Sequence, residues 1–255
     1  MSIDRRALLV LLLALVCGCS ATARPPAIGK VLVVGATGQT GRLVVRELQR
    51  QGFTVRAFVR DAEKARRLLG DELEIVTGDV KDPASLPAAM AGMDALISAI
   101  GARSATGPDR PEKVDFEGVR NLAQAAAKAG LRHFVLVSSM GVTHEDHPLN
   151  KMFGDVLIWK ARGEQALRAS GVPYTIIRPG GLVNEAGGQG RLVVVQGDPQ
   201  VGRATVPRAD LATVCVAALF YPEASRNKTF ELYRSDGEPV SDWQAVLAAL
   251  APDPA

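Results

Sequence analysis

The chain has 255 residues, of which 47% are hydrophobic and 22% are charged, as is normal for a globular protein with one large core. Its net charge of +3 comes from Lys and Arg residues that are scattered among Asp and Glu. A nucleic-acid-binding surface needs a clustered basic stripe, so we expect no nucleic-acid partner. These totals leave the oligomeric state open.

The N-terminal segment differs in character from the rest of the chain. Arg5 and Arg6 precede an apolar run over 7–16, which is shorter than the roughly 20 residues that span a membrane and is typical of an export signal. The pair is also similar to a twin-arginine signal. The following VCGCS is similar to the lipidation site of bacterial lipoproteins, and Cys19 is the better candidate because the small Gly18 precedes it.

The alternative for this segment is a buried N-terminal helix. The export interpretation predicts a signal and linker over 1–24 and one folded domain over 25–255. It also predicts a periplasmic protein, or one that a lipid on Cys19 anchors in a bacterial membrane. Apart from that anchor, no membrane contact is expected.

After the linker, apolar β-rich runs alternate with helical patterns. Strands are predicted over 30–34, 54–59, 73–77, 94–99, 132–138 and 173–178. Helices are predicted over 39–51, 61–69, 83–91, 112–130 and 150–170. This alternation is typical of an α/β protein with a Rossmann-type, doubly wound parallel sheet.

The remaining segment is expected to form a small cap on the substrate side of the sheet. It contains an apolar run over 192–195, a helix over 209–221, a strand over 229–233 and a helix over 241–250. Two irregular stretches, 101–111 and 180–190, follow predicted strands. Loops at the carboxyl edge of such a sheet border the ligand, so both are expected to act as lids.

The turn GATGQTG connects the first strand to the first helix. Glycines at this position let the backbone approach a diphosphate, while the helix N-terminus points its free N–H groups at the anion. Threonine hydroxyls can add further donors. The turn therefore predicts a dinucleotide site that includes Gly35, Thr37, Gly38, Gln39, Thr40 and Gly41.

The second strand ends at Arg60, where this architecture meets the adenosine ribose. An arginine there accommodates the 2′-phosphate of NADP, and Lys64 one turn later adds positive charge. We therefore expect NADP, with NAD possible. The alternative is that Asp61 binds the ribose while Arg60 is a solvated strand end. After the third strand, Asp79 and Val80 are candidates for the adenine, although an Asp there is also a common turn residue.

A set of motifs along the chain resembles one family. They are GATGQTG, Val59-Arg60, Gly78-Asp79-Val80, HFVLVSSMG, WKARGEQAL and YTIIRPGGL. Together they are similar to the atypical short-chain dehydrogenases/reductases with NAD(P)-binding, NmrA-like domains. The resemblance implies a Rossmann fold and NAD(P) binding. It also implies catalytic roles for Ser139 and Lys160, with Lys160 holding the nicotinamide ribose. The alternative for Lys160 is an i, i+4 pair with Glu164 on an exposed helix face.

The family's usual catalytic tyrosine is absent. Its place, four residues before Lys160, is taken by Val156, which cannot donate a proton. A substitute donor could come from the loop 144–147, HEDH, whose alternative interpretation is a solvated polar loop. Two histidines in such a loop do not define a coordination shell, so no metal is predicted.

These residues predict an NADPH-dependent oxidoreductase that passes hydride to a small conjugated acceptor, such as a flavin or a quinone. Loss of the tyrosine slows carbonyl chemistry by about 10²- to 10⁴-fold but leaves such acceptors accessible. The segment 178–181, RPGG, is expected to form part of the cofactor wall. The alternative function is a non-catalytic NADP(H)-binding redox sensor or assembly factor.

Overall fold

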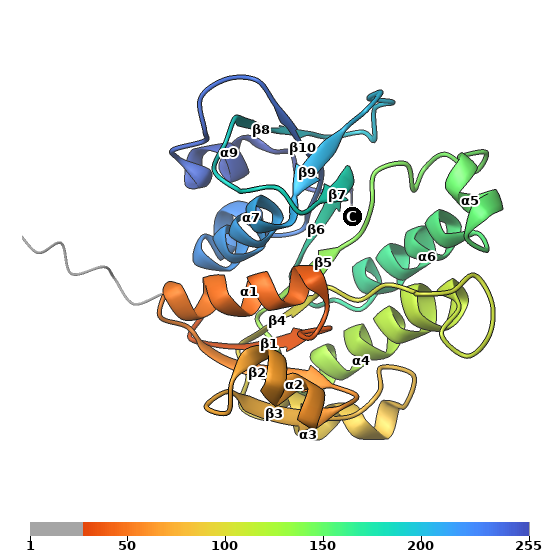
Figure 1. The fold of residues 1–255 in the computed structure, drawn as a ribbon, viewed down its shortest axis with the longest axis vertical. Helices are drawn as coiled ribbons and strands as arrows, with labels where there is room; N and C mark the ends of the chain where they lie inside the picture. The colour runs from red at the N-terminus through yellow and green to blue at the C-terminus, as the bar shows by residue number, and fades with distance from the viewer. Residues whose placement is uncertain (1–27, 255) are drawn as a thin grey trace, which may run out of the picture.

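The computed structural model describes residues 28–254, which build one eight-stranded sheet with helices on both faces (Figure 1). The strand order is β3-β2-β1-β4-β5-β6-β10-β8, and every neighbouring pair is parallel except β10 with β8. The strands are β1 (Lys30–Val34), β2 (Thr54–Val59), β3 (Glu74–Thr77), β4 (Ala95–Ser98), β5 (His133–Val137), β6 (Tyr174–Pro179), β8 (Arg191–Val195) and β10 (Lys228–Ser235). The predicted Rossmann-type sheet is confirmed, and the first six predicted strands agree within one residue at each end.

Alternating side chains of the strands supply the two hydrophobic cores. Val31 and Val33 of β1 face the layer that contains α1 (Gln39–Arg50), α2 (Ala62–Leu69) and α7 (Arg208–Phe220). Leu32 and Val34 face the layer of α3 (Leu86–Met90), α4 (Val119–Ala129) and α6 (Val156–Arg168). Since successive residues of a strand point to opposite faces, a continuous apolar strand is buried on both.

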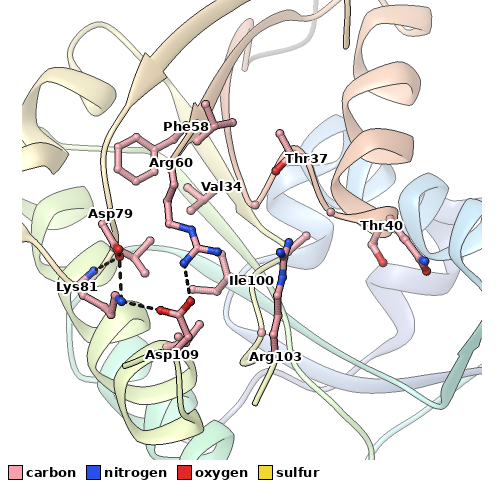
Figure 2. A pocket seen from close by; sticks show the side chains of 18 of the residues that line it. Val34, Thr37, Thr40, Phe58, Arg60, Asp79, Lys81, Ile100, Arg103 and Asp109 are labelled. Atoms are coloured by element: carbon pink, nitrogen blue, oxygen red, sulfur yellow. Dashed lines mark hydrogen bonds and ion pairs between the residues drawn. The ribbon is translucent and has the colours of Figure 1, made fainter. Parts of the chain in front are cut away.

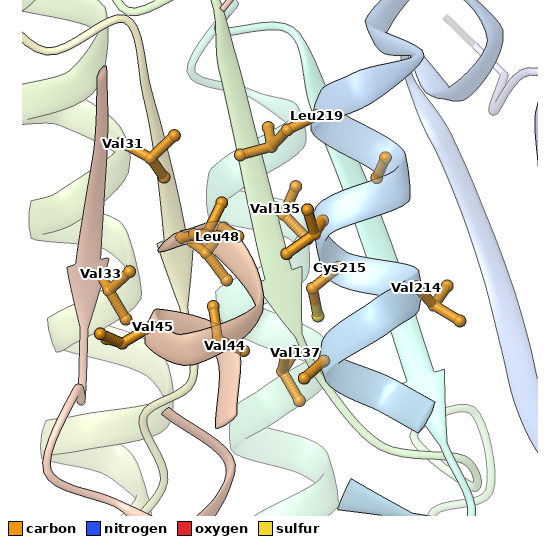
Figure 3. Packing of buried hydrophobic residues seen from close by; sticks show 14 of the residues in the cluster. Val31, Val33, Val44, Val45, Leu48, Val135, Val137, Val214, Cys215 and Leu219 are labelled. Atoms are coloured by element: carbon orange, nitrogen blue, oxygen red, sulfur yellow. The ribbon is translucent and has the colours of Figure 1, made fainter. Parts of the chain in front are cut away.

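The contact between α1 and α7 forms the centre of the first core (Figure 3). Val44 and Leu48 of α1 lie beside Cys215 and Leu219 of α7, and all four side chains are fully buried above the sheet. Burying one such side chain stabilises a fold by roughly 1.5–3 kcal/mol. Helix α7 is apolar on nearly all sides because α1, the sheet and α9 (Trp243–Ala249) surround it.

Two of the predicted helices differ in detail. The segment predicted over 150–170 forms two helices, α5 (Pro148–Met152) and α6, because Gly154 and Asp155 between them both adopt φ of 58°. The segment predicted over 112–130 begins with a wide π-helical turn, η2 (Glu112–Gly118), before α4 starts. Both irregularities lie beside the cleft described below, where π-helical turns are often found.

The C-terminal segment caps the sheet only in part. Strands β10 and β8 extend the central sheet, and α7 belongs to its core. The cap itself is a two-stranded sheet of β7 (Gly181–Val183) and β9 (Thr205–Pro207), together with the loops that adjoin it. Strand β7 lies within the stretch 180–190, which was expected to be irregular. The short helices η1 (Pro83–Ser85) and α8 (Pro222–Ser225) complete the described chain.

The strand order reverses between β1 and β4, which are neighbours although β2 and β3 intervene in the sequence. The chain therefore leaves the carboxyl ends of these two strands in opposite directions. In open α/β sheets a crevice forms at this point and binds the ligand.

Candidate functional site

Two adjoining cavities, of about 490 and 1120 Å³, occupy the carboxyl edge of the sheet. The first lies over the turn after β1 and extends toward β2 and β3. The second lies over β5 and β6 and is bordered by the loop 144–149. Both cavities are lined by Thr40, Ala99, Ile100, Gly101, Leu182 and Arg208. They form one continuous cleft that extends from the tip of β2 to the end of β6.

The glycine turn fits its predicted role as an anion cradle. Gly35 adopts φ of +82°, and a Cβ added to it would lie 2.8 Å from the Ala99 carbonyl oxygen. A Cβ on Gly41 would lie 2.2 Å from the Gly35 oxygen, so glycine there lets α1 start tight against the turn. Gly38 caps α1 without a side-chain hydrogen bond, and the first turn of α1 carries no acid. The free N–H groups of this helix end therefore suit a diphosphate.

The predicted residues of the turn do not all touch the cavity. Gly35, Thr37, Gly38, Gln39 and Thr40 line the first cavity, whereas Gly41 packs beneath the turn. The contacts of Gly41 are with the chain itself, so its role is to shape the cradle.

At the tip of β2, Arg60 lines the first cavity and Asp61 does not. The Asp61 carboxylate accepts the Lys64 N–H at 2.9 Å and caps α2. Lys64 is also absent from the lining, and the lysine that joins Arg60 is Lys81. The sequence analysis missed Lys81, although it directly follows the Gly78-Asp79-Val80 motif.

Arg60 and Lys81 both bind the carboxylate of Asp109, which comes from the loop 101–111 (Figure 2). Arg60 Nη1 lies 2.6 Å from Oδ2 and Lys81 Nζ lies 2.6 Å from Oδ1. Hydrogen bonds from Lys81 and Arg60 lower the pKa of Asp109 to about 2. We call these three residues the open cluster, because the Arg60 side chain is 51% exposed.

The two candidates for the adenine both line the first cavity. Val80 is almost fully buried, and its carbonyl accepts the amide of Asn121 at 2.9 Å. The Asp79 carboxylate accepts the Lys81 N–H at 2.9 Å, which is the bond of an ordinary turn residue, and lies 3.5 Å from Lys81 Nζ. The Asp79 side chain thus stabilises the turn by a hydrogen bond and also lines the first cavity.

Ser139 and Lys160 both line the second cavity. Lys160 Nζ donates to Asp115 Oδ1 at 2.7 Å, and Asp115 also accepts the Ala102 N–H at 3.0 Å. This contact depends on Gly163, because a Cβ there would lie 2.2 Å from the Asp115 carbonyl oxygen and would push α6 away from η2. Ser139 Oγ donates to the Met140 carbonyl at 3.0 Å, so its lone pairs remain available.

Neither cavity has a tyrosine among the described residues that line it. Val156, which takes the place of the usual tyrosine, is also absent from both linings. The cleft thus presents hydroxyl, ammonium and imidazole groups but no phenol.

A buried cluster of ions lies beneath the second cavity. Arg178 Nη2 is 2.7 Å from Glu164 Oε2 and its Nη1 is 3.0 Å from Glu231 Oε1. Ser138 Oγ donates to Glu164 at 2.6 Å and so ties this cluster to the end of β5. We call Glu164, Arg178 and Glu231 the buried cluster. Burial raises the pKa of the Glu231 carboxyl, although Arg178 opposes that effect.

Only part of the segment 178–181, predicted as a cofactor wall, reaches the cleft. Pro179, Gly180 and Gly181 line the second cavity, whereas Arg178 points away into the buried cluster. The alternative in which Glu164 pairs with Lys160 along α6 is likewise wrong, since Glu164 binds Arg178 and Arg168.

The polar loop 144–147 lines the second cavity over its whole length. His144 Nε2 lies 2.9 Å from the carbonyl oxygen of Asp198, and His147 Nδ1 accepts the Leu149 N–H at 3.2 Å. The Asp198 carboxylate, which the sequence analysis missed, accepts the N–H groups of Gly141 and Thr143 and fixes this loop. Residues 28–254 contain no group of three or more His, Cys, Asp or Glu side chains that could hold a metal.

A family model described as NAD(P)H-binding matches residues 35–222, which include the glycine turn and, apart from Val34, all residues that line the two cavities. The chain belongs to this family of atypical short-chain dehydrogenases/reductases. It is an NAD(P)H-dependent oxidoreductase, as predicted.

Its relatives include enzymes named as reductases. The chain is 40% identical to sanguinarine reductase of Eschscholzia californica, with 86% of this chain and 95% of that protein covered. It is 30% identical to an NAD(P)H azoreductase of Xenophilus azovorans, over 88% of this chain and 74% of that protein.

Solved structures share the fold of this oxidoreductase. A Bacillus halodurans protein described as an NAD-dependent epimerase/dehydratase is 30% identical and superposes with a TM-score of 0.75, covering 86% of this chain and 98% of its own. An anaerobilin reductase of Escherichia coli is 25% identical, with a TM-score of 0.67, and covers 83% of this chain and all of its own.

The predicted location is contradicted by plant relatives. An uncharacterised chloroplastic protein of Arabidopsis thaliana is 37% identical, over 86% of this chain and 75% of that protein, and other plant relatives are chloroplastic too. The prediction of a bacterial periplasmic or lipid-anchored protein is therefore wrong. Basic residues before an apolar run occur in more than one class of targeting segment, so the pattern did not fix the compartment.

The residues of that prediction, 1–24 with Cys19, lie outside the described residues. Within 28–254, no helix is both long enough and apolar enough to cross a membrane.

Proposed function

We propose that this oxidoreductase prefers NADPH to NADH and transfers hydride to a small conjugated acceptor, such as a flavin or a quinone. The observation that carries the cofactor preference is that the acidic and the basic residues at the tip of β2 have different partners. Asp61, the residue that would select NAD, is bound to the N-terminus of α2. Arg60 and Lys81 instead face the cavity with their charges converging on one anion position.

The remaining groups fit a dinucleotide that lies along the cleft. The uncapped start of α1 and the glycine turn suit its diphosphate, while Val80 offers an apolar wall to the adenine. Lys160, held by Asp115, lies at the far end, where it can donate to the nicotinamide ribose. NADPH supplies the hydride when bound.

The second cavity suits an acceptor that needs little acid catalysis. Ser139 can orient a polar atom of the acceptor, and Lys160 supplies positive charge next to it. With no tyrosine in the lining, a reduced carbonyl oxygen would have no phenol to protonate it. A flavin or a quinone delocalises the negative charge left by hydride addition and takes its proton from water. Since general acid help is worth about 10²- to 10⁴-fold, this difference selects the class of acceptor.

The test of this proposal is steady-state oxidation of NADPH and of NADH against a panel of flavins, quinones and simple aldehydes. We expect turnover with at least one conjugated acceptor, a higher kcat/KM with NADPH, and no turnover of the aldehydes. Turnover confined to aldehydes would refute the acceptor class. Equal kcat/KM values for the two cofactors would refute the cofactor preference.

The matching variant is Arg60→Ala. A charge-assisted hydrogen bond contributes about 1.5–3 kcal/mol, so kcat/KM for NADPH should fall about 10- to 100-fold while that for NADH stays within about twofold. Arg66→Ala is the control, because Arg66 is exposed on α2 and absent from the cavity. Equal losses for both cofactors in Arg60→Ala would remove the 2′-phosphate assignment.

A further inference from the structure

The open cluster has an unusual composition for a site that would bind a phosphate. Arg60 and Lys81 come from the ends of neighbouring strands, and a carboxylate from another loop already lies between them (Figure 2). Both of its oxygens are used, one by each cation, at 2.6 Å. The next anion, Asp79, is further from Lys81, at 3.5 Å.

A carboxylate that bridges two cations resembles the contact that a phosphate would make. Phosphate oxygens and carboxylate oxygens accept the same charge-assisted hydrogen bonds from guanidinium and ammonium groups. If the 2′-phosphate of NADPH binds Arg60 and Lys81, it needs the donors that Asp109 holds. The two anions also repel each other, so they cannot share this position at short range.

We infer that Asp109 is an internal competitor of the 2′-phosphate: its carboxylate occupies the phosphate position in the free enzyme and is displaced when NADPH binds. This inference rests on the proposed NADPH preference. It assigns to Asp109 the role of a specificity-determining residue, which weakens binding of cofactors that carry a 2′-phosphate and leaves binding of cofactors without one unaffected.

The surroundings of Asp109 allow such an exchange. Among the described residues, the only side chains that its carboxylate binds are Arg60 and Lys81. Asp109 is 30% exposed, and it follows Gly107, whose φ is +80°. The neighbouring bonds of this part of the loop are longer: the Pro108 carbonyl accepts Lys81 Nζ at 3.3 Å, and the Gly107 carbonyl accepts the Arg110 N–H at 3.4 Å. Displacing Asp109 therefore breaks solvent-accessible contacts only.

The experiment compares Asp109→Asn with wild type by titration calorimetry. The ligands are adenosine 2′,5′-bisphosphate, which carries the 2′-phosphate, and 5′-AMP, which lacks it. Each partly exposed ion pair contributes a factor of up to about 5, so Asp109→Asn should tighten binding of the bisphosphate about 3- to 10-fold. Binding of 5′-AMP should stay within about twofold.

Glu112→Gln is the matched control. It removes the same charge three positions further along the chain, but Glu112 pairs with Arg110 and contacts neither member of the cation pair. It should leave both ligands unaffected. If Glu112→Gln tightens binding of the bisphosphate as much as Asp109→Asn does, the effect comes from the general change of charge and the inference fails.

Two other outcomes would also overturn the inference. Weaker binding of the bisphosphate in Asp109→Asn would show that Asp109 orients the cations for the phosphate, and unchanged binding would show that it does not compete with the phosphate. Weaker binding of 5′-AMP alone would show that Asp109 binds the ribose hydroxyl. Arg60→Ala separates these failures from a failure of the NADPH proposal. If Arg60→Ala weakens binding of the bisphosphate while Asp109→Asn does not strengthen that binding, the inference about Asp109 fails and the NADPH proposal stands.

Discussion

The two ion clusters of the cleft have similar distances and opposite surroundings. In the buried cluster, Arg178 lies 2.7 Å from Glu164 and 3.0 Å from Glu231, and the two carboxylates are at most 1% exposed. In the open cluster, the contacts of Asp109 are even shorter, at 2.6 Å, but half of the Arg60 side chain is in water. One cluster lies beneath the cleft, and the other borders it.

The difference shows that burial, and not contact distance, decides what an ion cluster can do. Separating desolvated charges leaves an unpaired ion in a medium that does not solvate it, so the buried cluster acts as a fixed support for β5, β6 and α6. Charges at the surface lose little when water or a ligand replaces their partner. The open cluster is thus the one that can exchange its anion.

The largest effect is expected from Arg178→Met. The variant leaves Glu231 without its ion partner and Glu164 with Arg168 alone, and the free energy of unfolding should fall by about 3–5 kcal/mol. Urea denaturation measures this loss, with Arg66→Met on the exposed face of α2 as the control. A loss below about 1 kcal/mol would mean that the buried cluster behaves like the open one, and the comparison would fail.

Lys160→Met tests a cation whose burial lies between these extremes, with its side chain 16% exposed. If Lys160 positions the cofactor, kcat/KM should fall about 10²-fold. The variant also leaves Asp115 without its ion partner, so stability must be measured alongside activity. Adding Asp115→Asn should restore stability and not activity. Recovery of activity in the double variant would show that Lys160 has only a structural role.

The smallest effect is expected from salt. Raising the ionic strength from about 0.05 to about 0.5 M shortens the Debye length and screens exposed charges far more than buried ones. NADPH affinity should drop several-fold and more steeply than NADH affinity, while the midpoint of urea unfolding changes little. An equal decline for the two cofactors would place the salt-sensitive contacts at the diphosphate, away from the open cluster.

Features that depend on neighbouring residues were predictable from the sequence. The strands β1 to β6 follow from apolar runs, and the glycine turn follows from the spacing of Gly35, Gly38 and Gly41 between a strand and a helix. Arg60 was predicted as a cavity residue because, in this sheet topology, the tip of β2 lies where the adenosine ribose binds. Each of these inferences needs only the local pattern and the order of elements.

Features that depend on distant residues could not be predicted. The partner of Lys160 is Asp115, which lies 45 positions earlier, and the i, i+4 neighbour Glu164 was the only partner that the sequence suggested. Asp109 reaches Arg60 across 49 positions through an irregular loop. Arg178 was predicted as part of the cofactor wall together with Pro179, which lines the second cavity, yet alternation along β6 turns the Arg178 side chain away from that cavity.

Cys215 gives the first core a built-in reporter. The thiol is fully buried between α7 and α1, and burial raises its pKa to about 12, so it should not react with alkylating reagents in the native state. Reaction then requires α7 to separate from α1, and its rate measures how often that happens. In a variant with Cys17 and Cys19 replaced by serine, the rate of Cys215 alkylation would measure how often α7 separates from α1. Measuring this rate with and without NADPH would show whether the cofactor slows that opening.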